Sequence, residues 1–350
     1  MALMEFLSEL SVENTIIDCP LNSCLTTSCV ALSNQVNPLL IAQLNSSADY
    51  IILAGPTASG KSAIALDLAA EIDGVIINAD SMQVYKDLHI LTARPNSVDE
   101  ALRPHRLYGV VDGAERYSVG HWLRDVQEIV QQVRTQGRWP ILVGGTGLYL
   151  KAAEYGLSSI PDIPSVVRSK ATSLYSEHGG EGCLERLREQ DPVIADRLQP
   201  GDKQRVIRAL EVVMHTGKPL SYWQALPRQG GLTGRAFKLA HIPDRQIIYK
   251  WIDRRFEKMV NGGGLQEVEK LVSRGLPSDL PVMRALGVTA LSAYLRGDFD
   301  KQRAIYLGCR DTRHYAKRQI TWLRNNFISN YENNEIYTNK VYRKIFPKIL

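Results

Sequence analysis

Residues Gly55 to Ser62 read GPTASGKS, and this stretch decides the fold. Glycine, four residues, glycine, lysine and serine form the P-loop pattern, whose backbone amides curl around phosphate oxygens. Lys61 would add a positive charge, and the hydroxyl of Ser62 would bind a Mg²⁺ ion that bridges the phosphates. We therefore expect a site for a di- or triphosphate at Gly55, Pro56, Thr57, Ala58, Ser59, Gly60, Lys61 and Ser62.

The sequence on either side of this loop has the pattern that a P-loop requires. Residues 50–54 are a short apolar run that predicts a buried strand, and residues 62–72 carry apolar residues at helical spacing. A second apolar run at residues 75–78 completes a strand–helix–strand unit, which requires a parallel sheet and a right-handed crossover. The expected fold class is α/β, with a P-loop NTPase-like parallel sheet flanked by helices.

The stretch from residue 161 to residue 235 has a different pattern, because prolines separate helical segments and no strand is evident. We expect a helical insertion domain there, within a P-loop core of residues 50–160 and 236–327. Residues 1–49 are expected to be a poorly ordered extension, and residues 328–350 a loosely attached tail. The core is expected to contain further strands at residues 107–111, 140–143 and 237–241, and helices at residues 119–136, 245–261, 265–274, 288–296 and 301–325.

Two polar side chains follow predicted strands, at the edge of an open α/β sheet where ligands bind. Asp80 follows the second strand and could act as a general base or hold a metal ion; its alternative role is an N-cap. Thr146 lies in the glycine turn at residues 144–147, which is expected to face the same cleft unless it is an ordinary turn. No acidic residue follows the strand at residues 140–143, which argues against ordinary ATP hydrolysis.

Basic residues are concentrated in the C-terminal half of the chain. The formal net charge is +5, yet no Lys or Arg precedes Lys61. Within the helix at residues 301–325, the stretch 310–324 interleaves five basic residues with two aromatic ones, namely Arg310, Arg313, Tyr315, Lys317, Arg318, Trp322 and Arg324. Guanidinium groups bind phosphates and flat rings stack on bases, so this helix favours nucleic acid; a solvated amphipathic helix is the alternative. Weaker candidates of the same kind are Gln204, Arg205, Arg208 and Arg284.

The composition excludes several classes of protein. No run of eighteen apolar residues occurs, so no membrane span is expected. The five cysteines show neither a zinc spacing nor a disulfide framework, which fits a reducing cytoplasm. The N-terminus lacks the positive start of a signal peptide and the arginines of a transit peptide.

Taken in order, these motifs resemble those of the tRNA dimethylallyltransferases, the bacterial-type tRNA isopentenyltransferases. The resemblance runs from Ile51 to about Phe327. The matching stretches are GPTASGKS at Gly55, NADSMQVY at Asn78, LVGGTGLYLKA at Leu142, DKQRVIRALEV at Asp202, MRALGV at Met283 and YAKRQITWLRN at Tyr315.

The resemblance implies a reaction. A dimethylallyl group passes from dimethylallyl diphosphate to N6 of the adenosine 3′ of the anticodon, in tRNAs that read codons beginning with U. The P-loop and Arg255 would hold the donor diphosphate, Mg²⁺ would be the cofactor, and Ser62 its protein ligand. Asp80 would take a proton from N6, and Thr146 would orient the reacting groups. The partners are tRNA and dimethylallyl diphosphate, and the protein is expected to act as a monomer without an obligate protein partner.

The resemblance also implies which residues contact tRNA and where this chain departs from the family. The insertion domain would close over the anticodon arm. Leu91 replaces a usual glycine, and Trp251 replaces an arginine that reaches the diphosphate, unless Arg254 or Arg255 substitutes. The expected tRNA contacts are Asp80, Ser81, Met82, Gln83, Thr146, Arg168, Gln204, Arg205, Val206, Ile207, Arg208, Arg284, Lys317, Arg318, Gln319 and Trp322.

Three other functions are compatible with the P-loop. A small-molecule or nucleotide kinase would leave the basic aromatic helix unexplained. An adenylate isopentenyltransferase, with free AMP as acceptor, would not need the long C-terminal half. A nucleotide-switched RNA-binding protein would carry out no chemistry, and an assay of dimethylallyl transfer separates it from the rest.

Overall fold

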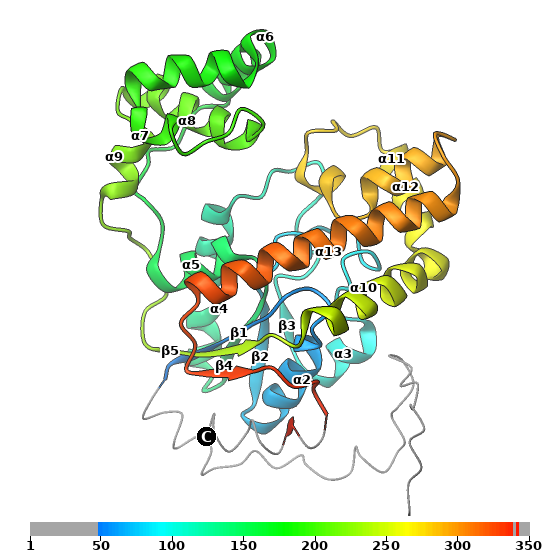
Figure 1. Ribbon diagram of the computed structural model, residues 1–350. Helices are drawn as coiled ribbons and strands as arrows, with labels where there is room; N and C mark the ends of the chain where they lie inside the picture. Colours follow the sequence, from blue (N-terminus) through cyan, green and yellow to red (C-terminus); the bar gives the residue numbers. More distant parts are fainter. Residues whose placement is uncertain (1–47, 339–340, 343–350) are drawn as a thin grey trace, which may run out of the picture. The chain divides into compact units, whose positions relative to one another are not determined.

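A parallel sheet of six strands carries the P-loop (Figure 1). The computed structural model describes residues 48–338 and 341–342. The strand order is β3-β2-β4-β1-β5-β6, and each neighbouring pair is parallel. The strands are β1 (Tyr50–Ala54), β2 (Gly74–Asn78), β3 (His105–Arg106), β4 (Trp139–Gly144), β5 (Ala236–His241) and β6 (Tyr331–Asn333).

Helices cover both faces of the sheet, as buried parallel strands require. Alternate residues of β1 enter different cores, with Ile52 in one and Ile51 and Leu53 in the other. The first core is covered by α4 (Val119–Thr135), α5 (Gly147–Tyr155), α10 (Arg245–Met259) and α13 (Lys301–Asn326). The second is covered by α2 (Lys61–Glu71). Because β1 is buried along its whole length, the P-loop starts from a rigid strand.

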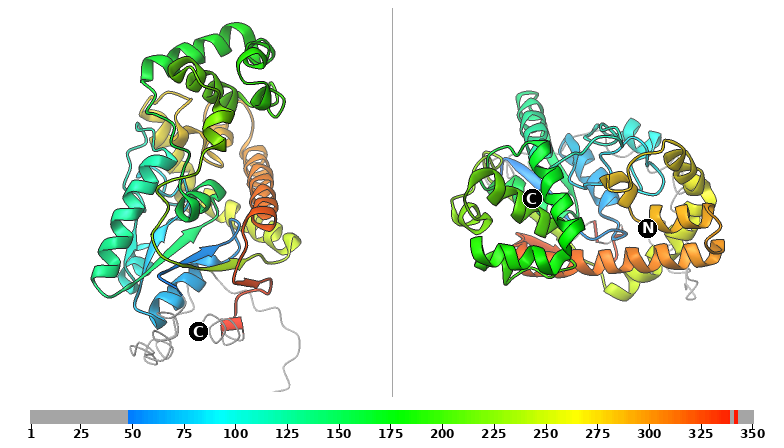
Figure 2. Two further views of the ribbon diagram at one scale, coloured as in Figure 1. Left: turned by 90° about the vertical axis from the view of Figure 1, so that its left-hand side faces the viewer. Right: turned by 90° about the horizontal axis from the view of Figure 1, so that it is seen from above.

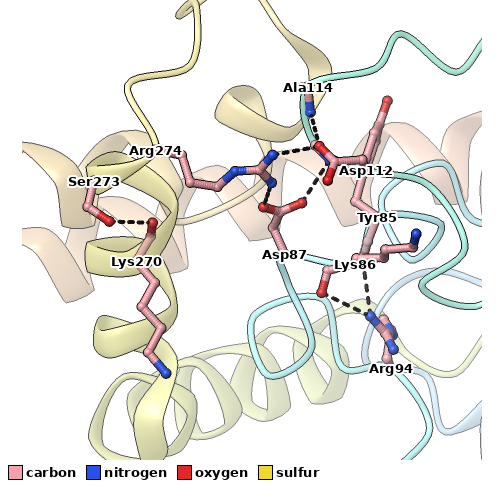
Figure 3. A network of polar contacts seen from close by, with 10 residues as sticks. Tyr85, Lys86, Asp87, Arg94, Asp112, Ala114, Lys270, Ser273 and Arg274 are labelled. Atoms are coloured by element: carbon pink, nitrogen blue, oxygen red, sulfur yellow. Dashed lines mark hydrogen bonds and ion pairs between the residues drawn. The ribbon is translucent and has the colours of Figure 1, made fainter.

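A third apolar cluster joins the loop after β2 to the helices before α13. Val84, Tyr85 and Leu88 from this loop pack with residues of α10, η1, α11, η2, α12 and α13. Figure 3 shows the polar contacts at its edge, where Arg274 forms ion pairs with both Asp87 and Asp112. The elements of this cluster not yet given bounds are η1 (Val260–Gly264), α11 (Leu265–Ser273), η2 (Pro281–Arg284) and α12 (Val288–Leu295); helix α3 (Ser97–Leu102) lies outside it.

The expected helical insertion is present as four helices with a core of their own (Figures 1 and 2). Leu157 and Gln229 lie where the chain leaves and rejoins the sheet, and each donates its backbone N–H to the other's carbonyl at 2.9 Å. The helices are α6 (Ser165–Gln190, kinked at Gly179), α7 (Pro192–Ala195), α8 (Lys203–Thr216) and α9 (Leu220–Ala225).

Several predicted elements need correction. The strand expected at residues 107–111 is wrong, because β3 ends at Arg106 and Leu107 has a positive φ of 64°. The expected loose tail is also wrong for part of its length. Strand β6 pairs with β5, and the hydroxyl of Tyr337 donates to Asp67 of α2 at 2.6 Å. The prediction for residues 1–49 falls outside the described residues except at positions 48 and 49. Among the described helices, none has the length and apolar character of a membrane span.

Candidate active site

The P-loop connects β1 to α2. The N–H of Gly55 donates to the carbonyl of Gly144 at 3.1 Å, which fixes the loop to the end of β4. Gly60 has φ 91°, a left-handed conformation that glycine adopts without strain. No side chain caps the N-terminus of α2. Its first N–H groups therefore remain available to an anion, as in other phosphate sites at helix N-termini.

Helix α13 fastens this loop from the other side. The side chain of Gln319 accepts the N–H of Thr57 at 2.8 Å and donates to the carbonyl of Gly145 at 2.9 Å. Gln319 is only 5% exposed, so both ends of its amide are used within the protein. The amide therefore has a structural role, the joining of the P-loop to the turn after β4, and the contact of Gln319 with tRNA stays a prediction.

Arg255 is the arginine that reaches the P-loop. Its guanidinium donates to the hydroxyl of Thr57 at 2.7 Å, whereas Arg254, its neighbour on α10, is exposed. Burial lowers the pKa of Arg255 to about 10, against the opposing effect of Asp80. The group therefore stays charged at neutral pH, and the structure supplies a guanidinium at this loop although Trp251 stands where the family has arginine.

Lys61 is the second cation of the loop. Burial lowers its pKa to about 8; the charge of Asp80 acts in the opposite direction, and that of Arg255 lowers the pKa further. Its ammonium group lies 3.3 Å from the carbonyl of Pro56. Two partly dehydrated cations and a row of backbone amides make this a site that an anion with several charges would stabilise.

Asp80 is positioned by the end of β2. Its N–H donates to Oδ1 of the fully buried Asn78 at 2.8 Å, and its own Oδ1 accepts the N–H of Met82 at 2.9 Å. Asn78 is in turn held by Trp122, whose indole N–H donates to its carbonyl at 2.8 Å. No helix starts within the next ten residues, so the alternative role of a helix N-cap is excluded.

Thr146 connects Asp80's strand to α13. Its hydroxyl accepts the N–H of Ser81 at 3.1 Å and hydrogen-bonds to the phenol of Tyr315. Burial raises the pKa of Tyr315, and the charge of Asp80 raises it further. The structure therefore brings together Asp80 and Thr146, the two predicted catalytic residues, through adjacent strand ends.

Two further tyrosines near Asp80 were missed by the sequence reasoning. Burial is the main cause that raises the pKa of Tyr108 and of Tyr149, and the negative charge of Asp80 adds to both effects. The phenols therefore stay neutral and can donate hydrogen bonds. The only available signal was the position of Tyr149 directly after the glycine turn; Tyr108 lay in a segment predicted to be a strand.

The predicted residues on α13 form a basic surface. Lys317 and Arg318 are exposed, and with His314, Trp322 and the amides of Asn325 and Asn326 they line a hollow of about 490 Å³. Arg313, in contrast, is paired with Asp253. This hollow contains cations and a large ring but no acidic side chain.

The predicted residues of the insertion separate into exposed and buried groups. Gln204 is exposed, as is Arg205, whose side chain is 75% accessible. Val206 and Ile207 are 0% and 5% exposed in the core of the insertion. Helix α8 turns both side chains inward, so the predicted contact of Val206 and Ile207 with tRNA stays a prediction for their backbone alone.

Four other predicted residues have partners or positions that the sequence did not reveal. Arg208 and Arg168 both pair with the buried Glu211, at 2.6 and 3.5 Å. Arg284 is exposed on η2. Gln83 donates to the carbonyls of Thr92 and Ala93 and so closes the loop after β2.

Leu91, which replaces the family's usual glycine, is accommodated in the third cluster. It is 8% exposed and packs there among apolar side chains. The substitution is therefore compatible with the fold.

A metal ion would find few protein ligands here. Ser62 is exposed in the first turn of α2, and the described part of the chain contains no group of three or more His, Cys, Asp or Glu that could hold a metal. Such a donor set fits Mg²⁺ held mainly by phosphate oxygens and water, since Mg²⁺ retains several of its waters.

The comparisons with known proteins agree with this geometry. The model of the IPP transferase family matches residues 83–326, and that of the isopentenyl transferases matches residues 48–113. The tRNA dimethylallyltransferase of Bradyrhizobium sp. (strain ORS 278) is 49% identical over 280 residues, which cover 78% of this chain and 89% of that protein. That of Methylobacterium sp. (strain 4-46) is 52% identical over 278 residues, 78% of this chain and 90% of that protein.

Solved structures of similar proteins have the same fold. The tRNA isopentenylpyrophosphate transferase of Bacillus halodurans is 30% identical with a TM-score of 0.61, covering 86% of this chain and 96% of that one. A eukaryotic dimethylallyltransferase, studied acting on tRNA, is 26% identical with a TM-score of 0.71, covering 85% of this chain and 77% of that one. The two family models together span the P-loop, Asp80 and helix α13, and the chain belongs to the IPP transferase family.

Proposed function

We propose that this protein transfers a dimethylallyl group from dimethylallyl diphosphate to N6 of the adenosine 3′ of the anticodon in tRNA. The observation that carries the proposal is the position of Asp80. Its charge acts on both cations of the P-loop, Lys61 and Arg255, and on the phenols of Tyr108 and Tyr315. A base and an anion site therefore lie close to each other, as an alkyl transfer from a diphosphate requires.

Asp80 is the general base in this reaction. The N6 nitrogen attacks C1 of the dimethylallyl group while the bond from C1 to the diphosphate oxygen breaks, and the bonding pair leaves with the diphosphate. The exocyclic amine of adenine is a weak nucleophile, so a positioned carboxylate that takes the N6 proton accelerates the attack. Thr146 holds the backbone beside Asp80 and so orients the base.

The P-loop stabilises the leaving group. Negative charge develops on the diphosphate as C1 separates, and fixed amides with nearby cations lower the energy of that state. Lys61 and Arg255 supply the side-chain charge, and the backbone N–H groups of Ala58, Gly60, Lys61 and Ser62 face the leaving group in this proposal. When bound, Mg²⁺ would neutralise further phosphate charge, with Ser62 as its protein ligand.

The basic hollow on α13 suits the tRNA. The target base must leave the anticodon-loop stack to reach Asp80, and aromatic rings stabilise unstacked bases. Trp322 offers such a ring, while Lys317 and Arg318 offer charge to the backbone. Ser81, Met82 and Arg284 border the same cleft in this proposal, and Gln204, Arg205 and Arg168 extend the contact to the insertion. All these residues come from one chain, so a monomer suffices for the reaction. The protein is proposed to act in the cytoplasm, and the free buried thiols of Cys183 and Cys309 are compatible with its reducing conditions.

The test uses dimethylallyl diphosphate labelled in the dimethylallyl group. The protein is incubated with this donor and, in separate reactions, total tRNA or AMP, with Asp80→Asn as the matched inactive control. A parallel reaction with γ-labelled ATP tests for kinase activity. We expect label on tRNA alone, located on N6-(dimethylallyl)adenosine after nuclease digestion. Label only on AMP, transfer of phosphate from ATP, or no transfer would contradict the proposal.

A further inference from the structure

A buried histidine lies directly behind the P-loop, outside the groups assigned so far. His241 is the last residue of β5 and is 0% exposed. Its Nε2 lies 2.7 Å from the carbonyl oxygen of Ser59 in the P-loop. Its Nδ1 lies 2.8 Å from Nδ2 of Asn333, which is 4% exposed and ends β6. The imidazole therefore bridges the phosphate loop and the last strand of the sheet.

The hydrogen bonds of Asn333 fix which nitrogen of the ring carries the proton. The same amide nitrogen of Asn333 also donates to the carbonyl of Glu335 at 3.0 Å, while its oxygen accepts the N–H of Glu335 at 3.3 Å. With a donor facing Nδ1, this nitrogen of His241 is an acceptor. Burial lowers the pKa of His241 to about 4, so the ring is neutral at physiological pH. Nε2 then carries the single proton and donates it to Ser59.

This hydrogen bond controls the direction of a peptide group in the P-loop. In a planar trans peptide the C=O and the following N–H point in opposite directions. Holding the carbonyl of Ser59 against His241 therefore directs the N–H of Gly60 to the opposite side. Ser59 lies between two residues of positive φ, Ala58 at 62° and Gly60 at 91°. Other φ and ψ values at these two residues would rotate the peptide group between Ser59 and Gly60. A carbonyl oxygen that rotated into the loop would repel phosphate.

The segment that supplies Asn333 is attached to the P-loop helix as well. Strand β6 is in register with β5, so that Asn333 is opposite His241. Further along, Tyr337 donates to Asp67 at 2.6 Å and Tyr342 hydrogen-bonds to Glu71, both on α2. The described residues of this segment, 331–338 and 341–342, thus contact both β5 and α2.

We propose that His241 and Asn333 are positioning residues for the diphosphate. They do not touch the donor. They hold the Ser59–Gly60 peptide so that its N–H, and not its carbonyl, faces the phosphates. The proposal rests on the proposed function for the identity of the donor, but its first readout is the binding of inorganic diphosphate alone.

Full-length variants test it. His241→Ala removes the hydrogen-bond donor, His241→Gln restores an amide N–H that can reach Ser59, and Asn333→Leu removes the partner of Nδ1. Tyr337→Phe is the matched control, because it loosens the same segment on α2 without touching His241. Titration calorimetry with inorganic diphosphate gives Kd, and steady-state transfer gives separate KM values for donor and tRNA.

We expect His241→Ala to raise Kd for diphosphate and KM for the donor about tenfold, the effect of one lost hydrogen bond. Asn333→Leu should act in the same direction, His241→Gln should recover most of the loss, and KM for tRNA should not change. An unchanged Kd in His241→Ala would overturn the proposal. So would an equal loss in Tyr337→Phe or in His241→Gln, because that pattern reports general destabilisation.

The two proposals fail in different ways. If wild-type protein binds diphosphate but transfers nothing to tRNA, the proposed function is wrong, and the Kd comparison still decides the role of His241. If His241→Ala does not fold, the same decision comes from comparing the Kd for diphosphate of Asn333→Leu with the values of His241→Gln and Tyr337→Phe.

Discussion

At the scale of single residues, Asp80 is held in place by backbone contacts that do not depend on its charge. Its N–H is bound by Asn78, and one carboxylate oxygen accepts from Met82. Asp80→Asn should therefore keep the loop intact and remove only the base. We expect kcat to fall by about 10²- to 10⁴-fold, the usual contribution of a general base, with tRNA affinity nearly unchanged in filter binding. Near-normal turnover would remove Asp80 as the base.

The neighbouring arginines on α10 form a natural pair of test and control. Arg255 reaches Thr57, whereas Arg254 is exposed. Lysine lacks the planar fork of a guanidinium, so Arg255→Lys should raise KM for the donor about tenfold and leave KM for tRNA unchanged. Arg254→Lys should change neither value. If the two variants behave alike, Arg255 does not compensate for Trp251.

The lowered pKa of Lys61 predicts that capture of the donor depends on pH. Burial lowers its pKa to about 8 in the free protein, so its charge is present below that pH and lost above it. The value of kcat/KM for the donor, which reports the free enzyme, should therefore fall as the pH rises through about 8. Lys61→Arg should abolish this decline, since arginine stays charged; a decline that persists would assign it to another group.

The lowered pKa of Lys61 also makes the stability of the protein depend on pH, and this contribution rises with pH where donor capture falls. Between about 8 and the ordinary value of 10.5, the unfolded chain still binds the lysine proton that the folded chain has released. Unfolding then takes up a proton, so the contribution of Lys61 to stability rises with pH in this window.

Much of the site at this scale could be predicted from local sequence. The P-loop, Asp80 and Thr146 follow strands, and the position after a strand fixes where a side chain lies in a parallel sheet. The bridging role of Gln319 and the burial of Val206 could not be predicted, because each depends on which face of a helix meets a distant element. His241 gave no signal, since its partners Ser59 and Asn333 are far from it in the chain.

At the scale of secondary-structure elements, the contact between α5 and α13 is close enough to depend on a glycine. A Cβ added to Gly147 would lie 2.3 Å from the ring of Trp322. Gly147→Ala should lower the free energy of unfolding by about 1–3 kcal/mol, the usual cost of overpacking, measured by urea denaturation. Gly262→Ala is the control, because a Cβ there meets nothing within 4 Å. Equal stability of the two variants would show that α13 can shift.

The predicted and observed elements differ where an element depends on pairing with a distant strand and not on a local apolar pattern. Strand β1 and helix α4 could be predicted, since each has a periodic apolar sequence. Strand β6 has three residues, Tyr331 to Asn333, without an apolar run. It exists because β5 offers a free edge, which is tertiary information. The predicted strand at residues 107–111 failed for a local reason: Leu107 turns the chain by its positive φ.

At the scale of the whole molecule, the insertion has the properties of a separable unit. Its apolar core shares no residue with the three others, and its two ends are joined by the Leu157–Gln229 pair. Two residues suffice to connect such an antiparallel pair. Replacing residues 158–228 by an Asn-Gly turn should therefore leave a folded protein that binds inorganic diphosphate.

This shortened chain should bind tRNA more weakly, and its affinity for tRNA should depend less on the salt concentration. Each phosphate contact removed lowers the slope of log K against log salt by about one, and Arg168, Arg205 and Arg208 all lie in the deleted part. The measurement is tRNA binding at several salt concentrations, with Arg205→Ala in the full chain as a single-contact reference. An unchanged slope would show that the insertion does not bind the tRNA backbone.

The bridge made by Gln319 has a consequence for the order in which the protein is synthesised. Thr57 precedes Gln319 by 262 residues, and Asn333 follows later still. A ribosome adding about 5–20 residues per second takes on the order of ten to fifty seconds to cover that distance. The nascent chain therefore carries a complete P-loop sequence long before the residues that shape it exist. Competence to bind diphosphate arises only near the completion of synthesis, so a chain released early has the motif without the site.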